Sequence, residues 1–292
     1  MRRSLLLATA LTTITFGCGQ SASNDEASSN AAVAPTPAAK PAEPVKISLA
    51  RLHCGRALFK NFDSFFSDRK GLYAPGARPL TDSCYLIQHG DQQMIWDTGF
   101  SAAMKGKETD LGELVVSVNF TLAEQLQQLG LAPTDIDVVG ISHMHSDHTG
   151  QAAQFANARL VIGKGDFEQS RGDEDPFGPW RREGAKVTLA SGDVDVFGDG
   201  TVTAVHLPGH TPDHLALLVK LASGPILLSG DLYHFREARQ KRGVPPFNTS
   251  RDETLKSMDR FEKLAKDTGA KVIIQHEPED VGLLPTFPKA AE

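Results

Sequence analysis

Positive charge is scarce and scattered in this sequence. The 292 residues carry a net charge of −6, and no cluster of lysine and arginine is larger than the short patch Gln240-Lys241-Arg242. A nucleic acid is therefore excluded as a partner on grounds of charge. Aromatic residues make up only 7% of the chain, against 40% hydrophobic and 23% charged residues. This composition is typical of one globular domain of moderate size or two small ones.

The amino-terminal apolar run is too short to span a bilayer. It covers about a dozen residues, from Leu5 to Phe16, and follows the basic start Met1-Arg2-Arg3. This pattern predicts an export signal over residues 1–17. Its end, Thr15-Phe16-Gly17-Cys18, resembles a bacterial lipobox with Cys18 as the lipidated residue. Cleavage by ordinary signal peptidase is the alternative.

Residues 18–45 are almost all Ser, Ala, Asn, Pro, Gly and acids, a composition that cannot bury a core. We expect a disordered tether there and a folded domain over residues 46–292. The predicted location is the periplasm or the outer membrane, with a lipid anchor at Cys18 as the only membrane contact. Secretion is the alternative.

Only two cysteines, Cys54 and Cys84, remain after Cys18. In an oxidising compartment they could pair. Each lies in a predicted strand, however, where a small buried thiol is the commoner role. We therefore expect both to be buried and unpaired.

The most informative stretch is the segment 141–150. Four metal-binding side chains fall within six positions of it, directly after the apolar run 137–141: His143, His145, Asp147 and His148. The run predicts a buried strand, and the carboxyl end of a strand is where open α/β sheets place their chemistry. Since Asp147 and His148 lie too close in the chain to share one metal comfortably with the first pair, the pattern favours two metals.

Three further strands are predicted to end near a metal-binding side chain. His210 follows the strand 201–206, Asp231 follows 225–229, and His276 follows 271–275. Five imidazoles and two carboxylates suit two divalent ions, most readily Zn²⁺. We expect one metal on His143, His145 and His210, and the other on Asp147, His148 and His276. Asp231 would bridge them, as in two-metal hydrolytic sites.

Other segments are expected to surround this site. Asp97 ends the strand 92–97, where it is either a hydrogen-bond acceptor for a ligand imidazole or a turn residue. Phenylalanines 59, 62, 65 and 66 are read as core residues, with an apolar pocket as the alternative. Residues 55–80 are expected to be irregular. The segment 100–120 is predicted to be a loop that forms a lid or pocket wall. The longest helix is predicted over residues 250–266, behind a Ser250-Glu253 capping box.

The pattern resembles the metallo-β-lactamase superfamily over roughly residues 46–292. His-x-His-x-Asp-His is matched in full at 143–148, and the family's Gly-His-Thr-Pro-Gly-His block occurs as Gly209-His210-Thr211-Pro212-Asp213-His214. Asp213 replaces the usual glycine there. The resemblance implies an α/β fold, a four-layer αβ/βα sandwich with two metal ions at the shared edge of two sheets.

Within the superfamily the chain resembles N-acyl-homoserine lactonases, especially exported forms. The likeness lies in the segments 80–87, 95–99 and 271–276. Several lactonases have a tyrosine three residues after the bridging aspartate, where it assists the substrate carbonyl. That position is His234 here, and Tyr233 precedes it. Either His234 or Tyr233 takes this role, so both join Asp147 and Asp231 as candidate catalytic residues.

The resemblance implies ring opening of an acyl lactone, a quorum-quenching activity. Asp231 or a metal-bound water would protonate the departing ring oxygen. An organophosphate triester hydrolase or another ester hydrolase of this fold is the alternative enzyme. A tethered metal-binding protein is the alternative that is not an enzyme. A β-lactamase is disfavoured because its closest subclass lacks the bridging aspartate. Acyl-chain length, metal identity and oligomeric state are left open, a dimer being one option.

Overall fold

The computed structural model describes residues 45–172 and 175–292. The predicted signal peptide and tether therefore lie outside the described residues, except for the last tether position. The described part contains two β-sheets. No helix in it is long and apolar enough to cross a membrane.

The first sheet has eight strands in the order β4-β5-β1-β2-β3-β6-β7-β8. They are β1 (Ile47–Phe59), β2 (Arg78–His89), β3 (Gln92–Trp96), β4 (Glu108–Asp110), β5 (Leu114–Ser117), β6 (Val138–Gly140), β7 (Arg159–Gly163) and β8 (Val187–Ala190). The pairs from β4 to β3 are antiparallel, and β3, β6, β7 and β8 run parallel. Their carboxyl ends therefore meet at one edge, where the segment 141–150 begins.

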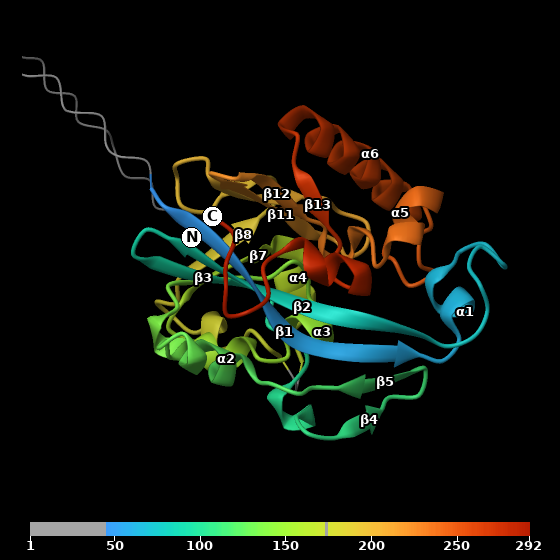
Figure 1. Ribbon diagram of the computed structural model, residues 1–292, viewed down its shortest axis with the longest axis horizontal. Helices are drawn as coiled ribbons and strands as arrows, with labels where there is room; N and C mark the ends of the chain where they lie inside the picture. The colour runs from blue at the N-terminus through green and yellow to red at the C-terminus, as the bar shows by residue number, and fades with distance from the viewer. Residues whose placement is uncertain (1–44, 173–174) are drawn as a thin grey trace, which may run out of the picture. The chain divides into compact units, whose positions relative to one another are not determined.

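The second sheet has five strands in the order β13-β12-β11-β10-β9. They are β9 (Val194–Asp195), β10 (Val202–His206), β11 (Leu215–Leu221), β12 (Gly224–Leu228) and β13 (Lys271–Ile273). Figure 1 shows this sheet stacked on the first, with the long helix on its outer side.

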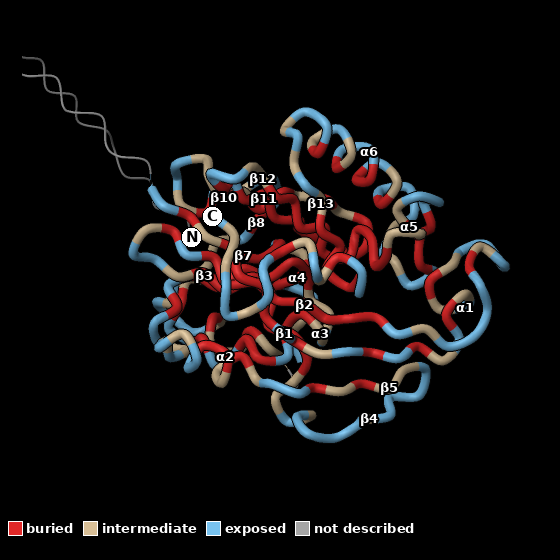
Figure 2. Tube along the Cα trace, viewed as in Figure 1, coloured by how far each residue is buried: buried red, intermediate tan, exposed pale blue. Residues whose placement is uncertain are grey.

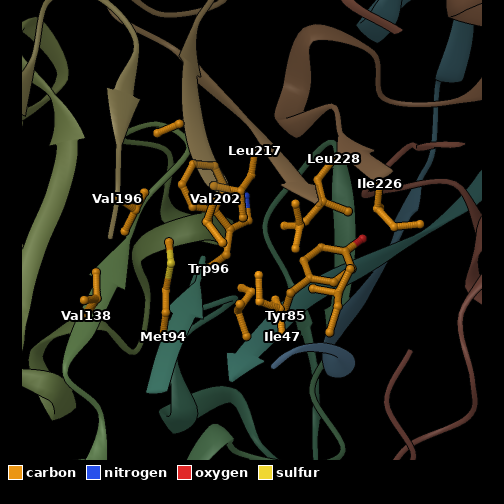
Figure 3. Packing of buried hydrophobic residues seen from close by; sticks show 14 of the residues in the cluster. Ile47, Tyr85, Met94, Trp96, Val138, Val196, Val202, Leu217, Ile226 and Leu228 are labelled. Carbon is orange, nitrogen blue, oxygen red and sulfur yellow. The ribbon is translucent and has the colours of Figure 1, made fainter. Parts of the chain in front are cut away.

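The core between the sheets is made of side chains that alternate along facing strands. Ile47, Tyr85 and Trp96 from the first sheet pack against Leu217 and Leu228 from the second (Figure 3). All but Ile47 among these five are fully buried. Because strand side chains alternate in direction, the other face of each sheet needs its own cover.

Helices supply that cover. On the first sheet it comes from α2 (Leu122–Gln128), α4 (Lys164–Gln169) and the turns between them. On the second it comes from α6 (Arg251–Thr268), which buries Met258, Phe261 and Ala265. Figure 2 shows α6 buried on its inner side and exposed on its outer side. The predicted four-layer α/β sandwich is confirmed.

The Ser250 side chain caps α6 by accepting a hydrogen bond from the backbone N–H of Glu253. Only this half of the predicted capping box is found, because the Ser250 backbone N–H donates to the Gly209 carbonyl instead of the Glu253 side chain. The helix ends at Thr268, two residues beyond the expected end at Lys266, and Gly269 follows it in a left-handed conformation. The helix therefore matches its sequence signals closely.

Two segments are more regular than expected. The first strand continues to Phe59, and α1 (Phe62–Phe66) follows it, so residues 55–80 are not simply irregular. Two short strands, β4 and β5, occupy part of 100–120. Strand pairing explains both corrections: β5 lies against the end of β1, and each supplies backbone partners to the other.

The expectation of unpaired cysteines was wrong. Cys54 and Cys84 form a disulfide between β1 and β2, with their Cα atoms 5.7 Å apart. In the register of this strand pair Cys84 lies opposite Leu52, and Cys54 is the residue of a bulge between His53 and Gly55 that has no partner in the register. Such a bulge cannot be read from the alternation of apolar residues, which explains the error. Both cysteines are fully buried, as expected.

Candidate metal centre

The predicted metal-binding side chains meet at the common edge of the two sheets. They form two groups that share Asp231: His143, His145, His210 and Asp231 in one, and Asp147, His148, His276 and Asp231 in the other. Within each group the ligand atoms lie within 4.8 Å of one another. The structure thus brings all seven residues together in the predicted division.

Three imidazoles converge in the first group. His145 Nδ1 lies 2.9 Å from His143 Nε2 and 3.1 Å from His210 Nε2. Asp231 Oδ2 completes the group, 3.6 Å from His143 and 3.5 Å from His210. These nitrogens are close together and direct their lone pairs at one point. Such an arrangement favours the binding of a cation over hydrogen bonds among the imidazoles.

The second group is built around the other oxygen of Asp231. Asp231 Oδ1 lies 3.3 Å from His148 Nε2 and 2.9 Å from His276 Nε2. Asp147 Oδ2 lies 3.8 Å from both imidazoles. Asp231 therefore points one carboxylate oxygen into each group, which is the geometry of a bridging ligand.

Short secondary elements hold these ligands. The helix α3 (Ser146–Thr149) carries Asp147 and His148, and the turn Gly230–Leu232 after β12 carries Asp231. His210 follows Gly209, whose φ is +129° and where a Cβ would lie 2.2 Å from the backbone nitrogen of Thr254. Only glycine lets this loop approach α6 so closely.

Each ligand imidazole except His145 has its other nitrogen fixed by a second partner. Asp97 Oδ2 lies 2.9 Å from His148 Nδ1, and the Asn248 side-chain oxygen lies 2.9 Å from His210 Nδ1. Ser142 Oγ lies 3.0 Å from His143 Nδ1. The Thr81 carbonyl oxygen lies 2.8 Å from His276 Nδ1. Such contacts fix the tautomer and turn the free nitrogen towards a metal.

Asp97 shows both of the predicted behaviours. Its left-handed backbone, with φ of 59°, ends β3 in a turn, and its Oδ1 accepts a hydrogen bond from the backbone N–H of Ser142. The other oxygen faces His148. No sequence pattern indicated Asn248, Ser142 or the Thr81 carbonyl, because a group that orients a ligand without binding the metal follows no ligand spacing.

Electrostatics differ between the two groups. Burial lowers the pKa of His143 and of His210 well below the ordinary value. Burial also acts on His148 and His276, but there Asp231 and neighbouring carboxylates outweigh it. They raise the pKa of His148 well above its usual value, and that of His276 to about 9. The first group is therefore ready to donate lone pairs at neutral pH, whereas a metal must displace protons from the second.

The two candidates for assisting the carbonyl lie in different places. His234 Nε2 lies 3.1 Å from Asp231 Oδ2, and its ring lines the cavity beside the metal ligands. The Tyr233 hydroxyl donates instead to Glu262 on α6, 3.0 Å away. Because consecutive residues of an extended chain point in opposite directions, the structure brings His234 into the site and leaves Tyr233 outside it.

A cavity of about 340 Å³ opens onto the centre. Its lining is largely apolar and includes Phe59, Phe65, Phe66, Leu111, Leu114 and Phe247. The phenylalanines were predicted to be core residues, with an apolar pocket as the alternative, and each prediction holds in part. Phe62 is a core residue, whereas Phe59, Phe65 and Phe66 line the cavity. The 100–120 segment forms a wall, as expected. Phe247 was not foreseen, since it follows two prolines in a loop without a periodic pattern.

Asp82 is a further polar group in this cavity that sequence reasoning missed. It is 1% exposed, and neither of its carboxylate oxygens has a hydrogen-bond partner within the described residues. Burial raises its pKa to about 7. An acid in the middle of a predicted strand was the available signal.

Comparison with known proteins now identifies the class. The family model of the metallo-beta-lactamase superfamily matches residues 77–276. The chain belongs to this superfamily, and the paired ligand groups agree with its metal-dependent chemistry.

More specific relatives are N-acyl homoserine lactonases. The chain is 34% identical over 177 residues to the lactonase AttM of Azorhizobium caulinodans, a match that covers 57% of this chain and 66% of that enzyme, just under two thirds. It is 30% identical over 226 residues to AttM of Rhizobium johnstonii, covering 71% and 85% respectively. A solved quorum-quenching N-acyl homoserine lactone hydrolase shares the fold, with a TM-score of 0.72, 22% identity, and coverage of 85% of this chain and 99% of that one. The protein is a hydrolase of this superfamily.

Proposed function

We propose that the protein opens the lactone ring of N-acyl homoserine lactones, using two zinc ions. The observation that carries the proposal is the position of Asp231, which directs one oxygen into each ligand group at the end of an apolar cavity. The names of the relatives support the substrate class. Five imidazoles and two carboxylates are the donor set that suits Zn²⁺.

The donor set fits such ions on the structure's own evidence. Asp231 Oδ1 is buried and has no conventional hydrogen-bond donor within the described residues, although imidazole nitrogens surround it. When bound, two divalent cations supply Lewis acidity and a nucleophile that forms at neutral pH.

The protein's own residues would position the substrate. The apolar cavity receives the acyl chain and excludes water from it. His234 Nε2 faces the centre and is placed to donate a hydrogen bond to the lactone carbonyl, in the role that a tyrosine takes in related lactonases. Burial alone would raise the pKa of Asp231, but the surrounding imidazoles hold it well below its usual value, so Asp231 starts as a carboxylate. It is placed to take a proton from the attacking water and to pass that proton to the departing ring oxygen.

Hydrolysis assays test the proposal directly. The zinc-loaded protein should open N-hexanoyl and N-decanoyl homoserine lactones, with the acid product followed by mass spectrometry. His145→Ala should abolish turnover. A paraoxon-type triester and a β-lactam complete the panel. Turnover of the triester with both lactones left intact would replace the proposed substrate class.

Leu111 tests where the acyl chain lies. This side chain lines the cavity but is 48% exposed, so it can be changed at little cost in stability. Leu111→Ser should lower kcat/KM for the decanoyl substrate roughly fivefold, corresponding to about 1 kcal/mol of lost apolar contact, and leave the butanoyl substrate unchanged. Leu189→Ser, at a 40% exposed position outside the cavity, is the matched control. An equal loss of kcat/KM for the decanoyl and the butanoyl substrate would show that the acyl chain does not lie against Leu111.

We also infer export with a tether, on the basis of the leader at 1–17 and the segment 18–45. A lipid-modified amino terminus at Cys18 in the mature protein, detected by mass spectrometry, would support the anchor. An unmodified terminus downstream of the leader would leave export without one.

A further inference from the structure

A second cavity shares Leu80 and Thr81 with the catalytic cavity but includes none of the metal-binding residues, and it has a different character. It has a volume of about 350 Å³ and lies against β1, the end of β5 and the turn Pro278–Leu283. Its charged lining residues are Arg51 and Arg56, the imidazole of His53 lies beside them, and no acidic residue lines it. This is unusual for a chain whose net charge is −6.

Arg51 is the buried group at this cavity. It is only 6% exposed, and no carboxylate lies within 4.0 Å of its guanidinium in the described part of the chain. Its hydrogen-bond acceptors are neutral: Nε donates to Ser83 Oγ at 2.8 Å, and Nη2 donates to Thr81 Oγ1 at 3.1 Å. A buried charge without a counter-charge is costly, so native structures normally pair it.

The Arg51 guanidinium also has N–H groups that donate to no described residue. Arginine has five N–H groups. Besides those two bonds, its one other contact is that of Nη1 with His53 Nδ1, at 3.4 Å. Two N–H groups are thus left over on a side chain that lines the cavity. Planar N–H pairs of this kind match the oxygens of a phosphate or carboxylate.

The rim adds further positive charge. Arg56 is exposed and makes no hydrogen bond or ion pair with another described side chain. Asn119 and Ser117 add polar groups on the β5 side. His53 is held by its backbone, which exchanges hydrogen bonds with the buried Gln125 side chain at 2.8 Å in both directions. Its ring is therefore presented from a fixed strand position.

We propose that this cavity is a binding site for a small oxyanion, a phosphate or a carboxylate, held by Arg51 with Arg56 and His53 at its rim. Among the described residues Asp82 acts on Arg51 through space without an ion pair, and the anion supplies the counter-charge in direct contact. The site is separate from the metal centre, since none of its three basic residues lines the catalytic cavity. The proposal is independent of the lactone substrate.

Calorimetry on the metal-loaded full-length protein tests it. Inorganic phosphate is titrated at fixed ionic strength, with sodium chloride as the reference, and sodium acetate is a second arm. We expect saturable binding of phosphate. Acetate binding in addition would identify the occupant as a general oxyanion, and phosphate binding alone would identify it as a phosphate group.

Variants locate the binding. Arg56→Gln should weaken it about tenfold, the value of one charge-assisted hydrogen bond, and His53→Gln/Arg56→Gln should weaken it further. Arg182→Gln removes an exposed arginine outside the cavity and should change nothing. Arg51→Met should abolish binding. If that variant fails to fold, the two rim variants decide by themselves.

Two results would overturn the proposal. One is the absence of saturable binding to the wild-type protein. The other is binding that persists unchanged in the rim double variant, because the anion would then occupy the metal centre. Lactone assays on both rim variants, which are expected to keep wild-type kcat and KM, check that the metal centre is intact.

Discussion

Asp97 Oδ2 lies 2.9 Å from His148 Nδ1, and both side chains are fully buried. This contact holds the imidazole with Nε2 directed at the second ligand group. The same oxygen accepts a hydrogen bond from Gln275, and Oδ1 accepts one from the Ser142 backbone. A carboxylate is needed because three donors converge on its two oxygens.

Asp97→Asn should therefore weaken metal binding in the second group by about 10- to 100-fold, as loss of such an outer partner usually does. Asparagine tolerates the left-handed backbone at this position, so the fold should persist. Competition with a chromophoric zinc chelator measures the affinity. Asp137→Asn is the control, since Asp137 accepts a backbone N–H at the opposite end of the strands. Equal affinities in the wild type and the Asp97 variant would refute this role.

The two groups should lose their metals independently. The wild-type protein should hold two zinc ions per chain after dialysis, and His145→Ala and His276→Ala should each hold one, because each histidine belongs to one group only. Elemental analysis gives the count. His206→Gln, at the end of β10 and outside both groups, should retain two ions. A single ion in the wild type would contradict the bridged pair.

His214 should make metal-free stability depend on pH. Burial lowers its pKa to about 4, and its Nε2 accepts the backbone N–H of Asp231 at 3.0 Å. The unfolded chain, with an ordinary pKa near 6.5, binds the proton more tightly. The stability is therefore complete above pH 6.5, and about 3 kcal/mol is lost as the pH falls towards 4.

Urea unfolding in the presence of a chelator at pH 7.5 and at pH 4.5 measures this effect. His214→Gln can accept the same N–H without titrating, so its free energy of unfolding should fall less than that of the wild type. The difference between the two proteins removes the contribution of the other histidines. Parallel pH profiles would show that His214 is not the responsible group.

The disulfide should contribute to stability. It closes a separation of 30 residues, for which chain entropy predicts about 3 to 4 kcal/mol. Adding a reductant should lower the urea midpoint of the wild type. The double variant Cys54→Ala/Cys84→Ala should be less stable from the start and insensitive to the reductant. A wild-type midpoint that ignores the reductant, under conditions where thiol titration shows reduction, would count against the prediction.

The sequence by itself was enough to predict the seven candidate metal-binding residues and, through the family resemblance, the class of fold. His143–His148 sit within six residues, and each later ligand follows an apolar strand, so local patterns placed all seven at sheet edges. Asp231 could be assigned as the bridge because two sets of ligands needed one shared carboxylate. These signals depend on the spacing of residues along the chain, and that spacing is the same before and after folding.

Only the tertiary structure decided what depends on contacts between distant segments. Cys54, in the bulge of β1, forms a disulfide with Cys84, and the direction of one side chain separates His234 from Tyr233. The orienting partner Asn248 and the cavity residue Phe247 come from a loop with no pattern of its own. In the sequence Arg51 is one polar residue in a predicted strand. Only the structure shows that it is buried without a carboxylate in contact among the described residues. Packing, register and side-chain direction are set by the whole fold, and for that reason no local pattern contains them.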